Sequence, residues 1–382
     1  MISIKEKSDC AGCSACVSVC PHKAISFERD SEGFLYPKTD NRLCVNCHLC
    51  EEVCPIISIK VPNIETNEDV VSYASYALND DIRKGSSSGG VFLILAKEII
   101  DNGGVVYGVR YNDKMEVVHD RAEKLSELSS FSGSKYVQSN INGIFQKVKN
   151  DLIENRLVFF SGTPCQVQGL KLFLRKHYNN LICCDLLCYS VPSPMVFHDY
   201  IKFVQKKVGK KVQNFHMRSK DLGWGENTMK LFFEDGSFRN DRLSNLWSTM
   251  YWSRLIVRPS CFSCKFTSFK RCGDISIGDY WGLEKVHPEL IDKKGVSLVL
   301  VNNDDGKRLI EKVKNKLFLF QTDLDSCLQP SLLEPISKVD NRSVFWKNYH
   351  RFPFSVIAIK YWNYGIINRI KWLVYSSLLK KK

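Results

Sequence analysis

Two short runs near the N-terminus share the cysteine spacing C-x2-C-x2-C-x3-C-P and form the only internal repeat in the sequence. Residues 10–21 read CAGCSACVSVCP, and residues 44–55 read CVNCHLCEEVCP. Segments so rich in thiols have too few apolar side chains to build a core of their own. The fold of this region must therefore form around what the thiols hold.

This spacing is that of the bacterial ferredoxin run, in which three close thiolates hold one [4Fe–4S] cluster and the fourth cysteine ligates the other. Gly12 allows the backbone to approach the sulfides, while Pro21 and Pro55 turn the chain away. A pair of zinc sites is the alternative, which two complete four-cysteine runs disfavour. Residues 1–62 are thus expected to form an α+β, ferredoxin-like two-cluster domain. Its two ligand sets are Cys10, Cys13, Cys16 and Cys54, and Cys20, Cys44, Cys47 and Cys50.

The composition of the 382-residue chain is that of a globular protein, with 44% hydrophobic residues. The N-terminal segment MISIKEKSDC has no apolar stretch after its lysines, which argues against a secretory signal. We find no apolar run long enough to span a bilayer. A cytoplasmic, thiol-reducing setting is expected, in which cysteines at such spacings act as metal or redox sites.

Positive charge is concentrated at the C-terminal end, where residues 338–382 carry ten Lys or Arg against one Asp. The nearly neutral body argues against nucleic-acid binding. The tail at 336–382 also carries many aromatic residues, so it could lie on an anionic membrane face and make the protein membrane-peripheral, with Trp362, Trp372 and Tyr375 at the interface. A helix packed on the body, with a solvated lysine end, is the favoured alternative.

Between a linker at 61–70 and this tail, strand-like and helix-like patterns alternate, which favours an α/β body with several parallel strands. A hairpin is expected at 228–240, around Asp235 and Gly236. Strands are expected at 71–78, 105–111, 156–162 and 181–187. Helices are expected at 86–104, at 140–155, from TPCQ to about residue 177, and at 193–209.

Six short motifs follow one another in this body. They are GSSSGGVF (85–92), SGSKYVQS (132–139), SGTPCQVQGL (161–170), DLLCYSVPSP (185–194), RPSCFSCKF (258–266) and DISIGDYWG (274–282). Together they resemble the family of the coenzyme F420 hydrogenase/dehydrogenase beta subunit, in the branch with an N-terminal bacterial ferredoxin domain. The resemblance covers nearly everything except the tail.

This resemblance implies an iron–sulfur flavoprotein oxidoreductase with an α/β flavin-binding body of mixed sheet and helices. It assigns FAD binding to residues 72–155, and FAD plus a third cluster to residues 156–335. Electrons would pass from a low-potential donor, such as a ferredoxin or a reductase, through the clusters to FAD and then to an organic substrate. Members of this branch often sit among genes for surface-polysaccharide synthesis, which points to a sugar nucleotide or a related intermediate as substrate.

The candidate flavin site combines three of these motifs. SSSGG opens an apolar helix and offers N–H groups and a positive dipole end to a pyrophosphate; the alternative is an ordinary Ser N-cap with two packing glycines. No GxGxxG fingerprint occurs, so a standard dinucleotide fold is not supported. The segment SGTPCQ follows a buried strand, at the end of a sheet where α/β proteins bind ligands. The candidate cofactor-binding residues are Ser86, Ser87, Ser88, Gly89, Gly90, Ser134, Lys135, Tyr136, Gln138, Gly162, Thr163, Pro164 and Gln166.

Two residues are candidates for catalysis. The resemblance makes Lys135 a candidate to stabilise negative charge on the reduced ring, against the alternative of an exposed loop lysine. Asp279 follows a strand in GDYWG and is expected to line the pocket as a proton donor or as an acceptor of N–H groups. No hydrolytic Ser/His/Asp arrangement is found.

The remaining cysteines divide into candidate ligands and core thiols. Cys183 and Cys184 lie on opposite faces of a strand and are expected in the core. Cys272 is a possible substitute ligand, and Cys327 is taken as incidental. The candidate ligands of a third [4Fe–4S] cluster, or of a structural zinc, are Cys165, Cys188, Cys261 and Cys264.

Two further classes of function stay open. The chain could be an electron-transfer subunit without a substrate of its own, docked to a larger catalytic partner. It could also be a redox-sensing or scaffold protein that has lost its flavin.

Overall fold

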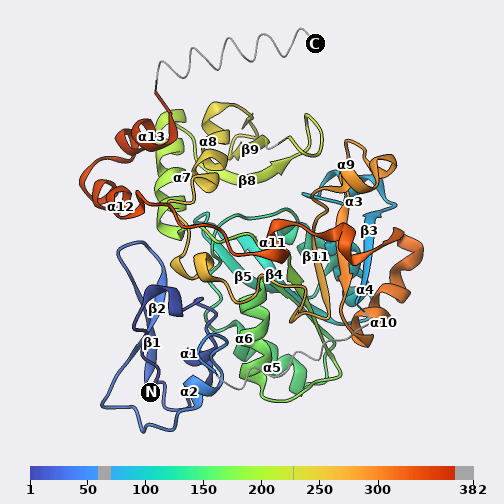
Figure 1. The fold of residues 1–382 in the computed structure, drawn as a ribbon, viewed down its shortest axis with the longest axis horizontal. Coiled ribbons are helices and arrows are strands. Elements are labelled where there is room, and N and C mark those ends of the chain that lie inside the picture. The colour runs from blue at the N-terminus through green and yellow to red at the C-terminus, as the bar shows by residue number, and fades with distance from the viewer. Residues whose placement is uncertain (59–69, 227, 366–382) are drawn as a thin grey trace.

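A mixed sheet of eight strands runs through the body of the molecule in the computed structural model, which describes residues 1–58, 70–226 and 228–365 (Figure 1). The central pairs β4–β6, β6–β7 and β7–β11 are parallel, and the outer pairs are antiparallel. The predicted α/β body is therefore confirmed. In sheet order the strands are β13 (Leu317–Thr322), β3 (Val71–Ala77), β12 (Ser297–Val301), β11 (Ile275–Asp279), β7 (Leu181–Leu186), β6 (Val158–Gly162), β4 (Val105–Tyr111) and β5 (Val117–Ala122).

Helices cover both faces of this sheet because its central strands are apolar on both sides. Cys184 faces the layer of α4 and α10, whereas Cys183 faces the layer of α5 and α6. Both thiols are fully buried, which confirms that they are core residues. The four helices are α4 (Val91–Asp101), α10 (Asp304–Val313), α5 (Ile144–Ile153) and α6 (Pro164–Leu174). Shorter helices at the rim are α3 (Asp80–Lys84), α9 (Leu283–Val286) and α11 (Pro330–Leu333).

The predicted elements of the body lie close to the observed ones. The four predicted strands correspond to β3, β4, β6 and β7. The helix expected at 86–104 begins only at Val91, because Gly90 caps it in a left-handed conformation with φ +86°. The boundary between residues 155 and 156 falls between α5 and β6, so both body regions build one sheet.

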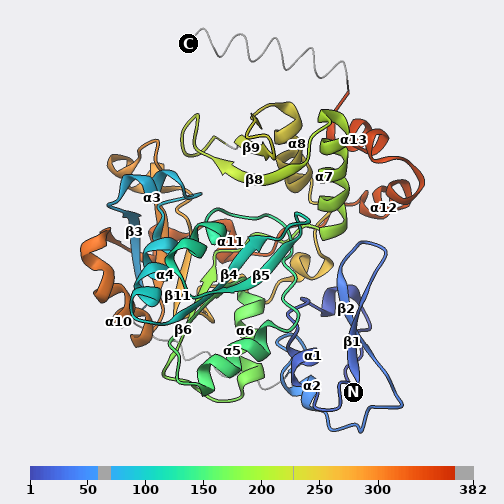
Figure 2. The same ribbon diagram turned by 180° about the vertical axis from the view of Figure 1, so that it is seen from behind.

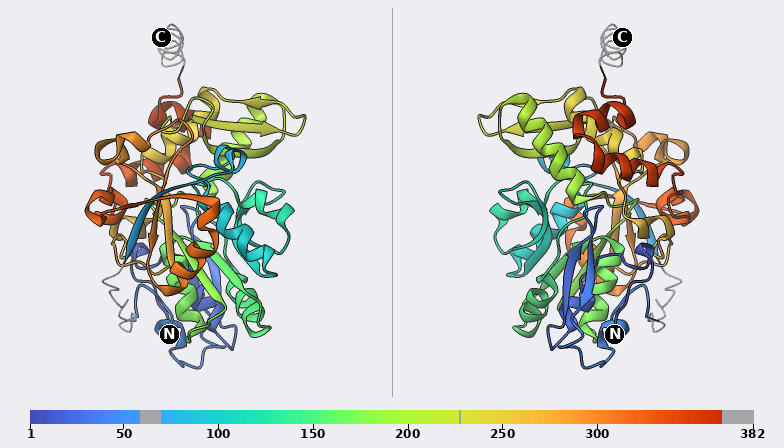
Figure 3. Two further views of the ribbon diagram at one scale, coloured as in Figure 1. Left: turned by 90° about the vertical axis from the view of Figure 1, so that its right-hand side faces the viewer. Right: turned by 90° about the vertical axis from the view of Figure 1, so that its left-hand side faces the viewer.

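A second, three-stranded sheet forms a lobe at the end of the molecule opposite the N-terminal unit (Figure 3). Its outer hairpin confirms the one expected at 228–240. Its strands are β8 (Val212–Ser219), β9 (Thr228–Phe233) and β10 (Phe238–Arg239). The helices packed with it are α7 (Pro194–Val208), α8 (Arg242–Trp252), α12 (Arg342–Arg351) and α13 (Phe354–Trp362).

The described part of the C-terminal tail belongs to this lobe. Phe345, Trp346 and Trp362 lie in its hydrophobic core, and Trp362 is only 2% exposed and donates a hydrogen bond to Ser253 Oγ (3.2 Å). Placing Trp362 at a membrane interface was therefore wrong, because its ring is already buried against the body. Trp372, Tyr375 and residues 380–382 lie outside the described residues. Within residues 1–58, 70–226 and 228–365, no helix has the length and apolar character to cross a bilayer.

The N-terminal unit preserves the sequence repeat in its backbone. The third residue of each cysteine run, Gly12 or Asn46, has positive φ, and so does the fifth, Ser14 or His48. Gly and Asn are the residues that tolerate this conformation best. The elements of the unit are α1 (Ala15–Val19), β1 (Ile25–Arg29), β2 (Leu35–Thr39) and α2 (Leu49–Glu52), with β1 and β2 antiparallel.

This unit packs on the body beside α5 and α6 (Figure 2). The two parts approach closely at Gly169 in α6, where an added Cβ would lie 2.9 Å from both Cβ and Sγ of Cys13. Ala15 and Val53 join the core formed by α5 and α6. The cysteine loop and the body thus share one apolar interface.

Gly169→Ala is expected to destabilise the protein by about 1–3 kcal/mol through overpacking. A loss of stability would point to the contact with the cysteine loop, because Gly→Ala inside a helix normally stabilises the helix. The free energy of unfolding from anaerobic urea denaturation measures the effect. A Gly169→Ala variant more stable than the wild type would contradict this close docking of the cysteine loop.

Candidate functional site

A cavity of about 550 Å³ opens where β6 and β7 end, within the size range of cofactor sites. Gly89 and Pro164 do not line it. The predicted cofactor-binding residues that line it are Ser86, Ser87, Ser88, Gly90, Ser134, Lys135, Tyr136, Gln138, Gly162, Thr163 and Gln166. The structure thus brings three sequence motifs to one cavity.

The Ser-rich loop before α4 does not form an ordinary serine cap. The cap residue is Gly90, and no side chain caps the helix. Gly89 packs instead against β3 and β12: its N–H donates to Ser297 Oγ (2.9 Å), and an added Cβ would lie 2.3 Å from Ser75 O. The first turn of α4 lines the cavity, so the positive end of the helix dipole faces it.

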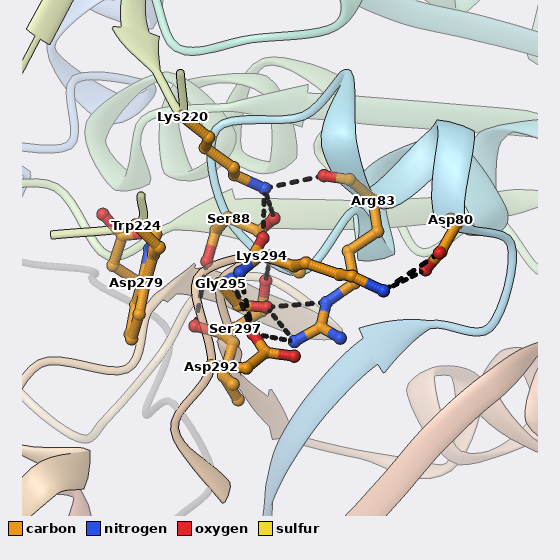
Figure 4. Close-up of polar contacts among 12 residues, drawn as sticks. Asp80, Arg83, Ser88, Lys220, Trp224, Asp279, Asp292, Lys294, Gly295 and Ser297 are labelled. Atoms are coloured by element: carbon orange, nitrogen blue, oxygen red, sulfur yellow. Dashed lines mark hydrogen bonds and ion pairs between the residues drawn. The ribbon is translucent and has the colours of Figure 1, made fainter. Parts of the chain in front are cut away.

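Two cations that the sequence motifs do not include, the half-buried Lys220 and the buried Arg83, contact the backbone around this loop (Figure 4). Lys220 Nζ donates to the carbonyls of Ser88 (2.5 Å), Arg83 (2.6 Å) and Lys294 (2.6 Å). Burial lowers the pKa of Lys220 to about 8. Arg83 forms an ion pair with Asp292 at 2.8 Å and donates to the carbonyl of Gly295. These contacts order the loop and add positive charge near the cavity.

A second helix N-terminus, that of α6, also faces the cavity. Thr163 and Gln166 form a reciprocal cap, and Gln166 Nε2 donates to Ser139 Oγ (3.0 Å). Ser139 Oγ also lies 2.9 Å from Nδ1 of His119, whose Nε2 is 3.1 Å from Ser161 O. Gln166 and Thr163 thus order the turn after β6, and His119 supports Gln166 through Ser139.

His119 predicts an acid-sensitive stability. Burial lowers the pKa of His119 from its usual 6.5 to about 4, so the unfolded chain takes up a proton first as the pH falls. The contribution of His119 to the free energy of unfolding is complete above about pH 6.5. It decreases by as much as about 3 kcal/mol as the pH falls towards 4. Between about pH 7 and about pH 5.5 we expect the wild type to lose about 1 kcal/mol more than His119→Gln, measured by urea denaturation.

The exposed His198 provides the matched control, because His198→Gln should change with pH as the wild type does. An unchanged pH dependence in His119→Gln would contradict the prediction.

Lys135 lines the cavity, but its ammonium group is already engaged. Its Nζ donates to the carbonyls of Ser132 (2.8 Å), Ser130 (3.0 Å) and Gly133 (3.1 Å). Burial lowers the pKa of Lys135 to about 7. In this position Lys135 first orders the loop at 130–135, while its charge stays next to the cavity.

Asp279 lies at the end of β11 and accepts hydrogen bonds in the cavity wall. It forms an ion pair with Arg218 at 2.8 Å and accepts from Trp224 Nε1 (3.2 Å). The arrangement matches the acceptor role expected for Asp279 rather than that of a proton donor. Asp279 is also the only acidic residue lining the cavity in the described part of the chain, so the cavity suits an anionic ligand.

Aromatic rings line the cavity from its interior to its mouth. The ring centroids of Tyr136 and Tyr251 are 4.9 Å apart, those of Tyr251 and Trp252 are 5.1 Å apart, and those of Trp252 and Trp281 are 6.1 Å apart. Trp252 and Trp281 are 40% and 47% exposed. The mouth therefore offers flat apolar surface to a ring-bearing ligand or to a partner protein.

The four candidate ligands of the third metal site come together at the cavity. Burial raises the pKa of the Cys188 thiol well above its usual value, and the neighbouring Cys261, Cys165 and Cys264 add to the rise. Cys165 and Cys188 line the cavity itself. Cys261 lies in a 3-10 turn at Pro259–Ser263, and Cys264 directly follows it. Chain segments far apart in sequence thus supply one thiol set.

The spacing of these thiols bears on the choice between zinc and a cluster. Among residues 1–58, 70–226 and 228–365, no three His, Cys, Asp or Glu side chains are close enough to hold a single metal ion. A [4Fe–4S] cube takes one thiolate at each of four iron corners, so its ligands stand farther apart than those of a tetrahedral zinc.

Cys272 lies beneath this set and has a structural role. Its Sγ lies 3.1 Å from Pro164 O and 3.3 Å from Asp185 Oδ2. Asp185 forms an ion pair with Arg271 at 3.0 Å, in which neither side chain is more than 1% exposed. Arg271 also donates to the carbonyls of Leu186 and Phe266, and so joins the Cys188 and Cys264 segments.

The N-terminal thiols group as the spacing predicts. Burial raises the pKa of the Cys16 thiol, and the neighbouring Cys10, Cys54 and Cys50 add to the rise, so thiols of the second run lie near the first run. The other predicted set, Cys20, Cys44, Cys47 and Cys50, lines one small surface cavity. Both sets are therefore assembled across the repeat.

Known proteins resemble this chain over most of its length. An uncharacterized protein of Methanocaldococcus jannaschii is 23% identical over 83% of this chain and 90% of its own length. The F subunit of the F(420)H(2) dehydrogenase of Methanosarcina mazei is 24% identical over 82% of this chain and 84% of its own. A chain of the F420-reducing [NiFe] hydrogenase complex from Methanosarcina barkeri aligns with a TM-score of 0.45 and 14% identity, covering 74% of this chain and 87% of that one.

Two family models match along the sequence. Residues 9–56 match the 4Fe-4S dicluster domain. Residues 155–326 match the C terminus of the coenzyme F420 hydrogenase/dehydrogenase beta subunit. The protein thus joins a 4Fe-4S dicluster domain to a region, residues 155–326, that matches the C terminus of coenzyme F420 hydrogenase/dehydrogenase beta subunits.

Proposed function

We propose that this protein is an iron–sulfur flavoprotein oxidoreductase that transfers electrons from a low-potential donor to FAD and on to an organic substrate. One observation carries the proposal: two cysteines of the third thiol set, Cys165 and Cys188, open onto the same cavity as the two helix N-termini of α4 and α6. A metal–thiolate group and an anionic ring-bearing cofactor would there be neighbours.

The lining residues fit a flavin dinucleotide. The first turn of α4 and the glycine backbone at Gly90 and Gly162 would hold the pyrophosphate, with Lys135 and Arg218 as nearby positive charge. The apolar side chains Phe131, Leu187 and Ile277 offer contacts to a flat ring. When bound, FAD would exchange electrons singly with the clusters and in pairs with a substrate. The resemblance to a branch that often sits among polysaccharide genes points to a sugar nucleotide or a related intermediate as that substrate.

Anaerobic purification with an iron count, flavin extraction and a visible spectrum tests this proposal. Three clusters contribute about twelve irons per chain, together with about one FAD. About eight irons and no flavin would remove the assignment of the body and leave the dicluster domain alone.

A second candidate is an electron-transfer subunit that docks to a larger catalytic partner. The exposed rings of Trp252 and Trp281 at the cavity mouth favour it, because such apolar surface suits a protein interface. Stable co-purification with a second chain, lost in a Trp252→Ser, Trp281→Ser double variant, would support this candidate. Turnover of a small molecule by the isolated chain would support the first.

We also propose that the protein is cytoplasmic. Residues of the C-terminal tail beyond the lobe are proposed to make a peripheral membrane contact. Binding of the full chain to anionic vesicles, compared with neutral vesicles, tests the contact.

A further inference from the structure

The two thiol sets of the dicluster domain lie in different surroundings. Cys10, Cys13, Cys16 and Cys54, here called the inner set, are all buried. In the outer set, Cys20, Cys44, Cys47 and Cys50, only Cys50 is buried, and Cys47 is exposed. The outer set lines a surface cavity together with His22 and His48. One set thus faces the body, and the other faces the surface.

Two side chains of the body make polar contacts with the loop of the inner set. Gln138 Nε2 donates to Ala11 O (3.0 Å), and Arg258 Nε donates to Cys10 O (2.7 Å). An added Cβ at Gly12, which has φ +70°, would lie 2.8 Å from Arg258 and 2.9 Å from Gln138. These two body residues therefore close over the backbone of the loop.

Arg258 is a buried cation, only 1% exposed. Besides Cys10, its guanidinium donates to Gln138 Oε1 (2.8 Å) and to Leu35 O (3.0 Å), and one nitrogen lies 3.5 Å from Cys10 Sγ. In the described ranges no carboxylate forms an ion pair with it; its other neighbours are the rings of Tyr36 and Phe34. Burying an unpaired guanidinium is costly, so its counter-charge should come from the thiolates of the inner set.

The same guanidinium also lies near the third thiol set. Arg258 directly precedes the turn that carries Cys261. The backbone N–H of Cys261 donates to the carbonyl of Arg258 (3.0 Å). Arg258 thus lies between the inner set and the thiols at the cavity.

We propose that Arg258 raises the reduction potential of the cluster at the inner set above that of the cluster at the outer set. Arg258 is then a positioning residue, and electrons leave the dicluster domain from the inner set. A fixed positive charge and a hydrogen bond at a cluster sulfur favour the reduced, more negative state. One electron leaves an external low-potential iron–sulfur donor, passes through the outer and then the inner set, and reduces the acceptor in the body by one electron. That last transfer rests on the proposed function, whereas the order of the two sets does not.

An anaerobic redox titration followed by electron paramagnetic resonance tests this proposal. In Arg258→Gln the potential of one N-terminal cluster is expected to become more negative, while that of the other stays unchanged. Gln138→Glu places a carboxylate against the guanidinium and is expected to shift the same cluster in the same direction, with Arg258 still present. The matched control is Arg42→Gln, which removes an 88% exposed charge near the outer set and should shift neither.

Cys47→Ser identifies the outer signal, because it alters an exposed ligand of that set. Unchanged potentials in both Arg258→Gln and Gln138→Glu, or a shift of the signal that Cys47→Ser alters, would overturn the proposal. If Arg258→Gln does not load the inner set, Gln138→Glu alone decides. A wild-type protein with about eight irons and no flavin would remove the proposed pocket function and leave this test intact.

Discussion

Serine in place of Cys261 is expected to remove about four of about twelve irons per chain. Cys261 belongs to the thiol set that borders the cavity, and a serine hydroxyl is a poor ligand for iron that prefers thiolate. The two clusters of the N-terminal domain should remain, because their eight cysteines lie in a separate part of the chain. Iron and zinc analysis of the anaerobically purified variant measures the loss.

Cys272→Ser is the matched control for this experiment. Cys272 is a neighbouring buried thiol whose contacts are Pro164 O and Asp185, so its replacement should keep all the iron. A loss of zinc instead of iron in Cys261→Ser would mean that the site is structural zinc. An iron loss in Cys272→Ser equal to that in Cys261→Ser would mean that the ligand set is misassigned.

Asp185→Asn is expected to destabilise the folded protein by about 3–5 kcal/mol. Neither Asp185 nor Arg271 is accessible to solvent, so the change leaves a buried guanidinium without its counter-charge. Gly273 N–H also donates to Asp185 Oδ2 (3.1 Å), and a neutral amide oxygen would accept this bond less strongly. The free energy of unfolding from anaerobic urea denaturation measures the effect.

Two comparisons separate this effect from simple loss of an ion pair. Glu311→Gln breaks the exposed pair with Lys314 and should change the free energy of unfolding very little, because solvent screens both charges. The double variant Asp185→Leu, Arg271→Met removes both buried charges and should be more stable than Asp185→Asn. If Asp185→Asn unfolds like Glu311→Gln, the buried pair does not support the third thiol set as described.

Much of the central sheet could be predicted because its signals are local. The strands β4, β6 and β7 are apolar runs that end at turn residues, and the helix α7 begins at a Ser-Pro pair and ends at Gly209. The strands β12 and β13 escaped prediction. They pair antiparallel with β3 across more than two hundred residues, and no local pattern encodes such a pairing.

The residues of the candidate site also divide into those with a local sequence signal and those placed by long-range contacts. SSSGG, SGSKYVQS and SGTPCQ could be found because each motif concentrates small and polar residues in one place. Lys220, Arg83 and His119 could not be found, because each is a single polar residue whose role comes from three-dimensional contacts alone. Gly89 was assigned to the cofactor, but the structure places it against Ser75 and Ser297. The sequence showed the position of Gly89 in the motif, but it did not show whether Gly89 faces the cavity or the sheet.

The cysteine spacing by itself determined the dicluster domain, because three ligands of each cluster lie within seven consecutive residues and the local backbone places them. Only the tertiary structure decided which cluster faces the body. That choice depends on Gly169, Gln138 and Arg258, which are more than a hundred residues from the cysteine loop that they contact. Long-range packing brought Cys165, Cys188 and the local pair Cys261 and Cys264 together in the same way, since these three segments are too far apart in sequence for local geometry to control.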